Sequence, residues 1–275
     1  MDAHDHCAAI LRARDRDRYV ADLFAPEAAR PHLFALHAFT TEIARVRDVV
    51  SDPTLGEIRL TWWRDALAEA DGQGHPVATA LLETIDKFSL PQAGFEMLLD
   101  ARRFDLYDDL MPSLDDLEAY AGGTASVVLK LGAAILCDRL GPAADEAAGH
   151  GGVAETLTEI MTMLPAHSAR GQCHLPADLM AAHGLDRDSL HAGRDTLALR
   201  SLLVELRSLA RTHLAKADDA IAGLPAETKP AFLPLALIAP TLDRMDRPGH
   251  RPLSDRALLA PWRRLWVIRR AARRG

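Results

Sequence analysis

The sequence predicts an all-α protein built as a single helical bundle. Its 275 residues are 48% hydrophobic, which is enough apolar material for one large core. Apolar residues recur at spacings of three and four along most of the chain, whereas no stretch alternates polar and apolar residues as a half-buried strand does. No low-complexity linker or internal repeat interrupts this pattern. We therefore expect one helical domain over residues 1–254 and a basic amphipathic helix over residues 255–275.

Prolines and glycines divide the chain into its expected helices. Pro53, Pro112 and Pro225 each stand between two apolar-periodic segments. Pro165 is expected to end the helix that contains it, because proline lacks a backbone N–H. The expected helices span roughly 5–23, 27–50, 54–72, 76–88, 91–110, 114–140, 144–165, 195–222, 227–246 and 255–272.

Composition limits the function classes. The formal net charge is −7, and residues 262–275 contain six arginines and no acid, so the preceding residues carry −13. An acidic body argues against nucleic acid as a partner. Three scattered cysteines without a CxxC pair suit a reducing compartment and no structural zinc. The first residues lack the apolar region of a signal peptide, and no run of about 18 uncharged apolar residues occurs, so we expect a cytoplasmic location.

Residues 157–176, LTEIMTMLPAHSARGQCHLP, carry the first informative motif. They resemble the second signature of the squalene/phytoene synthase family, LTNILRD-x-x-ED followed by ARRGR-x-Y-LP. In that family the acidic residues of the helix hold magnesium against a diphosphate. Here the corresponding positions are Met163, Ala166 and His167. A thioether, a methyl group and an imidazole do not provide the hard oxygen ligands that magnesium prefers.

Residues 36–63 resemble the first signature of the same family, in which an L-Y-A-F helix leads into R-x-x-DD-x-x-D. The aspartate positions fall on Ala44, Arg45 and Asp48, so one carboxylate of three remains. Asp48 can be a surface acid paired with Arg45 or with a neighbouring helix. Alternatively, Arg45 and Arg47 bind an anion directly, in place of the metal.

Further segments match the family in the same order, including WWR, GHPVA, FDLYDD and LEAY. The resemblance covers roughly residues 7–245. The version with MLPAHSARG in place of the metal motif resembles one subgroup, the phytoene-synthase-like assembly factors of respiratory complex I, which is regarded as non-catalytic. The resemblance implies the isoprenoid synthase fold, a helical bundle around a central apolar cavity.

Three functions remain open. The first is a catalytically inactive assembly or scaffold factor for a membrane respiratory complex, NADH:quinone oxidoreductase, with a complex subunit or another assembly factor as its partner. The second is a prenyl transferase that condenses or binds polyprenyl diphosphates. The third is a carrier for an isoprenoid or lipid. No cofactor or metal is expected, except magnesium if the protein is a prenyl transferase, because diphosphate departure requires charge stabilisation.

The family resemblance also indicates where a ligand would lie. We expect a pocket with an apolar interior between residues 39–48 and residues 157–164, with arginines at its mouth. The small residues 122–126 either leave space for a chain-like ligand or allow a neighbouring helix to pack closely. The candidate pocket-lining or anion-binding residues are Phe39, Arg45, Tyr120, Gly123 and Arg170.

The C-terminal helix has two interpretations. Tryptophan and arginine side by side on an amphipathic helix are typical of peripheral membrane binding, here on the inner face of the membrane. Alternatively, the apolar side packs on the body while the arginines pair with its acidic surface. Both can hold at once. The membrane-binding candidates are Trp262, Arg263, Arg264, Trp266, Arg269 and Arg270.

Overall fold

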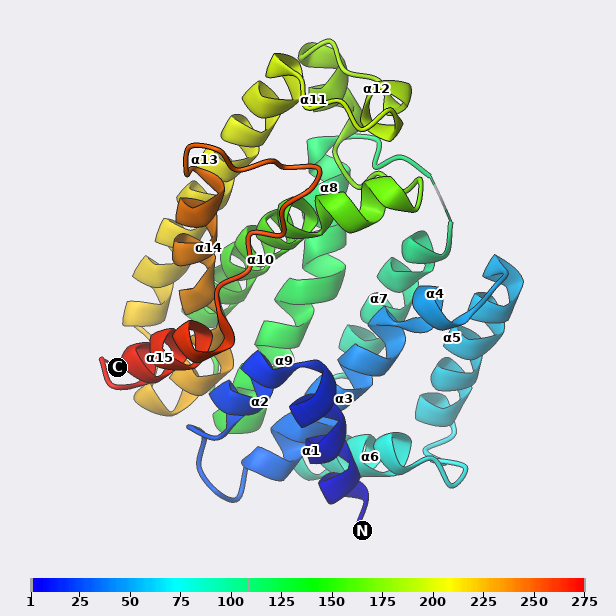
Figure 1. The fold of residues 1–275 in the computed structure, drawn as a ribbon. Helices are drawn as coiled ribbons and strands as arrows, with labels where there is room; N and C mark the ends of the chain where they lie inside the picture. Colours follow the sequence, from blue (N-terminus) through cyan, green and yellow to red (C-terminus); the bar gives the residue numbers. More distant parts are fainter. Residues whose placement is uncertain (1, 108, 275) are drawn as a thin grey trace.

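The computed structural model describes residues 2–107 and 109–274 and confirms the all-α prediction, since no strand occurs in these two ranges (Figure 1). The N-terminal half contains α1 (Ala3–Arg14), α2 (Arg16–Asp22), α3 (Arg30–Ala44), α4 (Val46–Val49), α5 (Pro53–Ala68), α6 (Pro76–Phe88), α7 (Gln92–Arg103), the 3-10 turn η1 (Phe104–Leu106), α8 (Leu114–Ala121), the π-helical turn η2 (Gly122–Ser126) and α9 (Val127–Leu136). The C-terminal half contains α10 (Pro142–Ala169), α11 (Ala177–Ala182), α12 (Arg187–His191), α13 (Leu197–Ala222), the 3-10 segment η3 (Ala226–Leu237), α14 (Ile238–Met245) and α15 (Pro261–Ala272).

Side-chain caps set several helix starts. The Asp52 carboxylate accepts a hydrogen bond from the backbone of Thr54, just ahead of Pro53 in the first turn of α5. Ser113 accepts from the backbone of Asp116 at the start of α8. Each cap satisfies an N–H group that has no partner inside its helix.

The core has two large parts that meet at α9. One part lies around α10, α13 and α14, and includes Leu129 and Ala133 of α9. The other lies around α1, α3, α6 and α7, and includes Leu131 and Ile135 of α9. Because α9 contributes opposite faces to both parts, it holds the two halves of the bundle together.

The stretch Leu114–Leu136, formed by α8, η2 and α9, is long and apolar enough to cross a membrane by length and composition. In this fold it runs through the bundle with most of its apolar window buried. Its small residues allow close packing: a Cβ on Gly123 would come within 2.9 Å of the Ala101 side chain of α7. A Cβ on Gly152 of α10 would come closer still, to 2.6 Å from the Cα of Ser126. These residues therefore bring helices together.

The expected end of α10 at Pro165 is wrong, because the helix continues to Ala169. A proline near a helix end removes only one hydrogen bond, which the remaining turn tolerates here. The helix ends where Gly171 adopts a φ of 73° and the Gln172 N–H donates to the carbonyl of His167. The expected helix over 5–23 is also two helices, since Asp15 leaves the helical conformation and caps α2.

The C-terminal helix α15 packs on α2 and η3 at one edge of the bundle (Figure 1). Ile268 is fully buried there against Ala21, Leu233 and Leu237. The expected range for this helix, 255–272, begins too early, because residues 246–260 form a connection of turns and irregular backbone before Pro261 starts α15.

Candidate functional site

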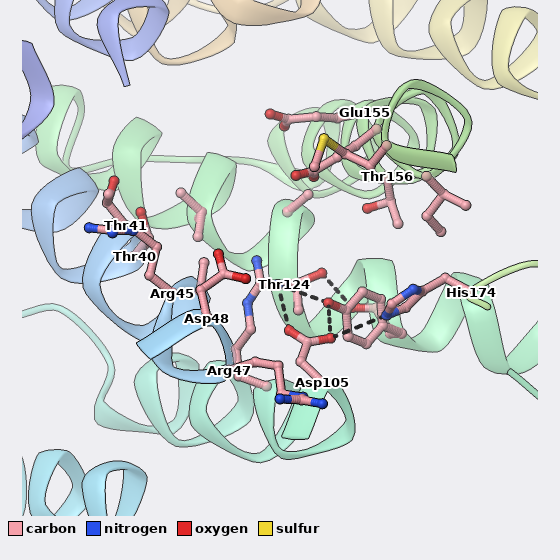
Figure 2. A pocket seen from close by; sticks show the side chains of 18 of the residues that line it. Thr40, Thr41, Arg45, Arg47, Asp48, Asp105, Thr124, Glu155, Thr156 and His174 are labelled. Carbon is pink, nitrogen blue, oxygen red and sulfur yellow. Dashed lines mark hydrogen bonds and ion pairs between the residues drawn. The ribbon is translucent and has the colours of Figure 1, made fainter. Parts of the chain in front are cut away.

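A cavity of about 560 Å³ lies between α3–α4 and α10, at the expected place (Figure 2). In Figure 2, Glu155 and Thr156 of α10 stand on one side of it. Arg45 and Asp48 approach from α3–α4, and Asp105 marks a third wall. Segments far apart in the sequence therefore line one space.

The expectation of an apolar interior is wrong. Six arginines and five carboxylates line the cavity, whereas its apolar residues are only Ala44, Ala125, Val128, Ile160 and Met163. The reason lies in the two faces of α10. The apolar face with Leu157 and Met161 packs into the core, and the opposite face turns Glu155 and Glu159 into the cavity.

Arg18 forms one charged network on the cavity wall. Its guanidinium donates to Glu155 at 2.7 Å and to Asp15 at 3.2 Å, which joins α2 to α10. Burial opposes the charge of Arg18, but the two carboxylates raise its pKa above the ordinary value. Burial would also raise the pKa of Asp15, and Arg18 reverses that effect and holds it below the ordinary value.

Arg102 forms a second network. It donates to Asp105 at 2.9 Å and to the Tyr120 hydroxyl at 2.8 Å, and that hydroxyl donates to Asp105 at 2.8 Å. Burial raises the pKa of Tyr120 well above its ordinary value, so the phenol remains protonated. These three hydrogen bonds hold α7, η1 and α8 together on this wall of the cavity.

At the mouth, Arg170 donates to Asp48 at 2.6 Å. Asp48, the one carboxylate retained from the first family signature, is therefore neutralised by a cation on the opposite wall. Arg45 lies beside this pair and also lines the cavity. The connection before α15 reaches the same region, where Arg256 donates to the Met163 sulfur at 3.3 Å.

Of the remaining candidate residues from the sequence, some line the cavity and others lie outside it. Tyr120 and His167 line the cavity, and burial next to His174 lowers the pKa of His167 to about 4. Ala166 does not line it. Phe39 and Gly123, expected as lining residues, lie elsewhere. Phe39 is fully buried with its ring 5.0 Å from that of Trp63, and Gly123 packs on α7.

Magnesium does not fit this site. In residues 2–107 and 109–274, no group of three or more histidine, cysteine, aspartate or glutamate side chains could hold a metal ion. Ala44 and Met163 offer no oxygen, and the Asp48 carboxylate binds Arg170. A hard cation that prefers six oxygen ligands would find no such set here.

The sequence analysis missed the interior charges of the cavity. Glu155 and Glu159 stand four residues apart on one face of a helix whose other face is apolar, and this spacing could have identified them. Arg18 and Asp15 lie in the charged run RARDRDRY, where no pattern distinguishes buried from exposed charges. Arg102 stands next to Arg103, which is exposed, so residue type does not show which of the two faces the cavity.

Known proteins of one family are similar to this chain in sequence and in fold. The profile of the squalene/phytoene synthase family matches residues 11–265. Assembly factor 6 of NADH dehydrogenase (ubiquinone) complex I from Rattus norvegicus is 32% identical over 267 residues, covering 94% of this chain and 80% of that protein. Phytoene synthase of Thermus thermophilus is 28% identical over 271 residues, covering 95% of this chain and 90% of that enzyme.

A solved dehydrosqualene synthase in complex with ligand is similar in structure, with a TM-score of 0.84 and 20% sequence identity. The match covers 99% of this chain and 96% of that one, which shows that the fold is shared from end to end. With the matched profile, the relatives and the common fold, this chain belongs to the squalene/phytoene synthase family.

Proposed function

We propose that this protein assists the assembly of the membrane respiratory complex NADH:quinone oxidoreductase and does not catalyse prenyl transfer. The relatives named complex I assembly factor 6 support the first part. The observation that carries the second part is the cavity itself. Ala44 and Met163 line it where the family's signatures place carboxylates, and Asp48 is bound by Arg170.

Prenyl transfer requires a cluster of positive charge that stabilises departing pyrophosphate, which magnesium supplies in this family. It also requires a surface for a long apolar chain. Here that chain would press against the Arg18–Glu155 and Arg102–Asp105 pairs and exclude water from them. Since removing water from charged pairs is costly, the cavity disfavours both the prenyl transferase and the carrier for an isoprenoid chain.

Deleting the gene in its native host tests the assembly role. We expect NADH:quinone oxidoreductase activity to fall in membranes, and subcomplexes to accumulate on native gels. Succinate dehydrogenase activity in the same membranes is the control for general loss of respiratory proteins.

The wild-type gene and a variant with Asp48→Asn should both restore the complex, because the proposed role needs no metal-binding carboxylate. Normal complex levels in the deletion strain would contradict the proposal. Rescue by wild type but failure of a folded Asp48→Asn protein would favour an enzyme instead.

We further propose that α15 attaches the protein peripherally to the inner face of the membrane. Trp262 and Trp266 are 69% and 55% exposed, while Ile268 alone buries fully against the body. The Arg270 guanidinium lies 5.1 Å from the centre of the Trp266 ring. Arg264 donates to Asp17 of α2, so the outward charge comes from the exposed arginines of the helix and of the residues directly after it: Arg263, Arg269, Arg270, Arg273 and Arg274.

Exposed tryptophans among arginines suit the headgroup region of an anionic leaflet. The acidic remainder of the chain would be repelled by that leaflet, so the basic helix also orients the molecule. Sedimentation with vesicles containing phosphatidylglycerol should pellet the protein, with less binding as salt rises. Equal binding to neutral vesicles would contradict this attachment.

A further inference from the structure

Four polar side chains of the cavity make no hydrogen bond or ion pair with any other residue in the described part of the chain. They come from three walls: Arg45 from α3–α4, Thr156 and Glu159 from α10, and Gln172 from the segment after α10. Thr156 and Gln172 are only 5% and 8% exposed. These two buried side chains lose hydrogen bonds on folding unless water or another molecule in the cavity satisfies them, whereas Glu159 is exposed.

These groups differ from the rest of the cavity, whose charges are paired. Arg18 is held by Asp15 and Glu155, Arg102 by Asp105, and Arg170 by Asp48. Arg14 pairs with Glu42, and Arg47 also has a partner. Arg45 is thus the cation whose charge remains available, and a planar guanidinium favours a phosphate or carboxylate that it can bind through two hydrogen bonds.

The other three groups suit hydrogen-bond donors on the same ligand. The Thr156 hydroxyl, the Gln172 amide oxygen and the Glu159 carboxylate can each accept from a hydroxyl or an amino group. Glu159 is exposed, so its carboxylate is accessible to a ligand in the cavity. A volume of about 560 Å³ is adequate for a small organic molecule, and five apolar lining residues offer little contact to a long hydrocarbon.

We propose that this cavity binds, without a metal ion, a small organic anion whose phosphate or carboxylate meets Arg45 and whose hydroxyl or amino groups meet Thr156, Glu159 and Gln172. A glycerol phosphate group has this chemistry, either as a free molecule or as a lipid headgroup. The site is independent of the assembly role, and either proposal can fail without the other.

Titration calorimetry on the full chain in the presence of EDTA provides the test. The probe is sn-glycerol 3-phosphate, which has both the anionic group and the hydroxyl donors. Glycerol lacks the anion and butyl phosphate lacks the hydroxyls. We expect saturable binding of the probe and weaker binding of both comparison compounds, because each satisfies only part of the site.

Arg45→Gln should weaken binding of the probe by about tenfold or more, since it removes a charge-assisted hydrogen bond. Thr156→Val keeps the shape of the side chain and should weaken binding severalfold. Arg263→Gln on exposed α15 is the matched control and should bind as the wild type does. Urea midpoints verify that every variant is folded.

The source of the ligand is resolved by a parallel titration with monomeric short-chain phosphatidylglycerol. Binding of this lipid that also depends on Arg45, and exceeds that of the free probe, identifies a headgroup; the reverse order identifies a free metabolite. The proposal is overturned if neither compound binds saturably, if binding requires magnesium, or if Arg45→Gln and Thr156→Val leave the affinity unchanged.

Discussion

At the scale of single residues, Gly152 determines how closely α10 approaches η2. A Cβ at this position would lie 2.6 Å from the Cα of Ser126, and backbone atoms cannot move aside as a flexible side chain can. Gly152→Ala should therefore destabilise the protein by about 1–3 kcal/mol, as overpacking does. Urea denaturation measures the change in the free energy of unfolding.

Gly149 lies in the same helix but has open space where its Cβ would be. Gly149→Ala should thus stabilise the protein by about 0.4–1 kcal/mol, because alanine loses less backbone entropy in a helix. Equal effects of the two substitutions would show that the close approach of Gly152 to Ser126 does not matter for stability.

His32 gives the protein a defined pH dependence. Lys87 donates to its Nε2 at 2.9 Å and its Nδ1 lies 2.9 Å from the Thr84 hydroxyl, an arrangement that requires neutral imidazole. Burial and Lys87 lower the pKa of His32 from 6.5 to about 4. Between pH 6.5 and pH 4, His32 is protonated in the unfolded state but neutral in the folded state. The contribution of neutral His32 to the free energy of unfolding is therefore complete above pH 6.5 and is lost as the pH falls towards 4.

The slope that His32 adds approaches about 1.4 kcal/mol per pH unit within this window. His32→Asn should lower stability at pH 7 but flatten its dependence on pH between 6.5 and 4. Urea midpoints measured at several pH values report both effects. An unchanged slope in the variant would mean that His32 is not the titrating group.

Residue types predicted part of the site and missed the rest for a physical reason. Ala44, Arg45 and Met163 were located because a motif fixes their spacing, and all three line the cavity. Phe39 was misplaced because aromatic residues beside a motif suit a core as well as a pocket. Glu155 faces the cavity because α2 brings Arg18 against it from 137 residues away, and no local pattern encodes such a pairing.

At the scale of elements, α15 contributes to stability through one buried residue and exposes its tryptophans to solvent. Ile268→Ala should cost about 2–5 kcal/mol, because it removes a fully buried side chain. Trp266→Ala should change stability by less than about 0.5 kcal/mol but release the protein from anionic vesicles, because its ring lies outside the body. Vesicle binding that survives Trp262→Ala combined with Trp266→Ala would exclude this helix as the attachment.

Helices were predictable in position where periodicity coincides with a proline at the start and a turn at the end. The expected range 76–88 equals α6, which has proline in its first turn and Ser89 in the left-handed region directly after its end. The sequence did not reveal that α10 passes Pro165, since the Ser168 hydroxyl of that last turn donates to the distant carbonyl of Leu190. The short helices α11 and α12 were also missed, because segments of five or six residues carry too little periodicity.

At the scale of the whole molecule, the family fold is retained while the chemistry of its cavity differs. Incubation with magnesium and farnesyl or geranylgeranyl diphosphate should yield no prenyl product. In the described part of the chain no group of carboxylates is placed to hold magnesium, and charged pairs interrupt the apolar surface of the cavity. A phytoene synthase assayed in parallel serves as the positive control, with release of pyrophosphate as the readout. Release that Asp48→Ala abolishes would show that the protein is an active enzyme.

The ion pair between Asp17 and Arg264 has a consequence for synthesis of the chain. Its two residues are 247 positions apart, and ribosomes add about 5–20 residues per second. The surface of α2 that α15 covers is therefore made roughly 12–50 s before its partner exists. During that interval the apolar edge formed by Val20 and Ala21 is open to chaperones and to other nascent chains. The yield of folded protein should then depend on how quickly α15 leaves the ribosome.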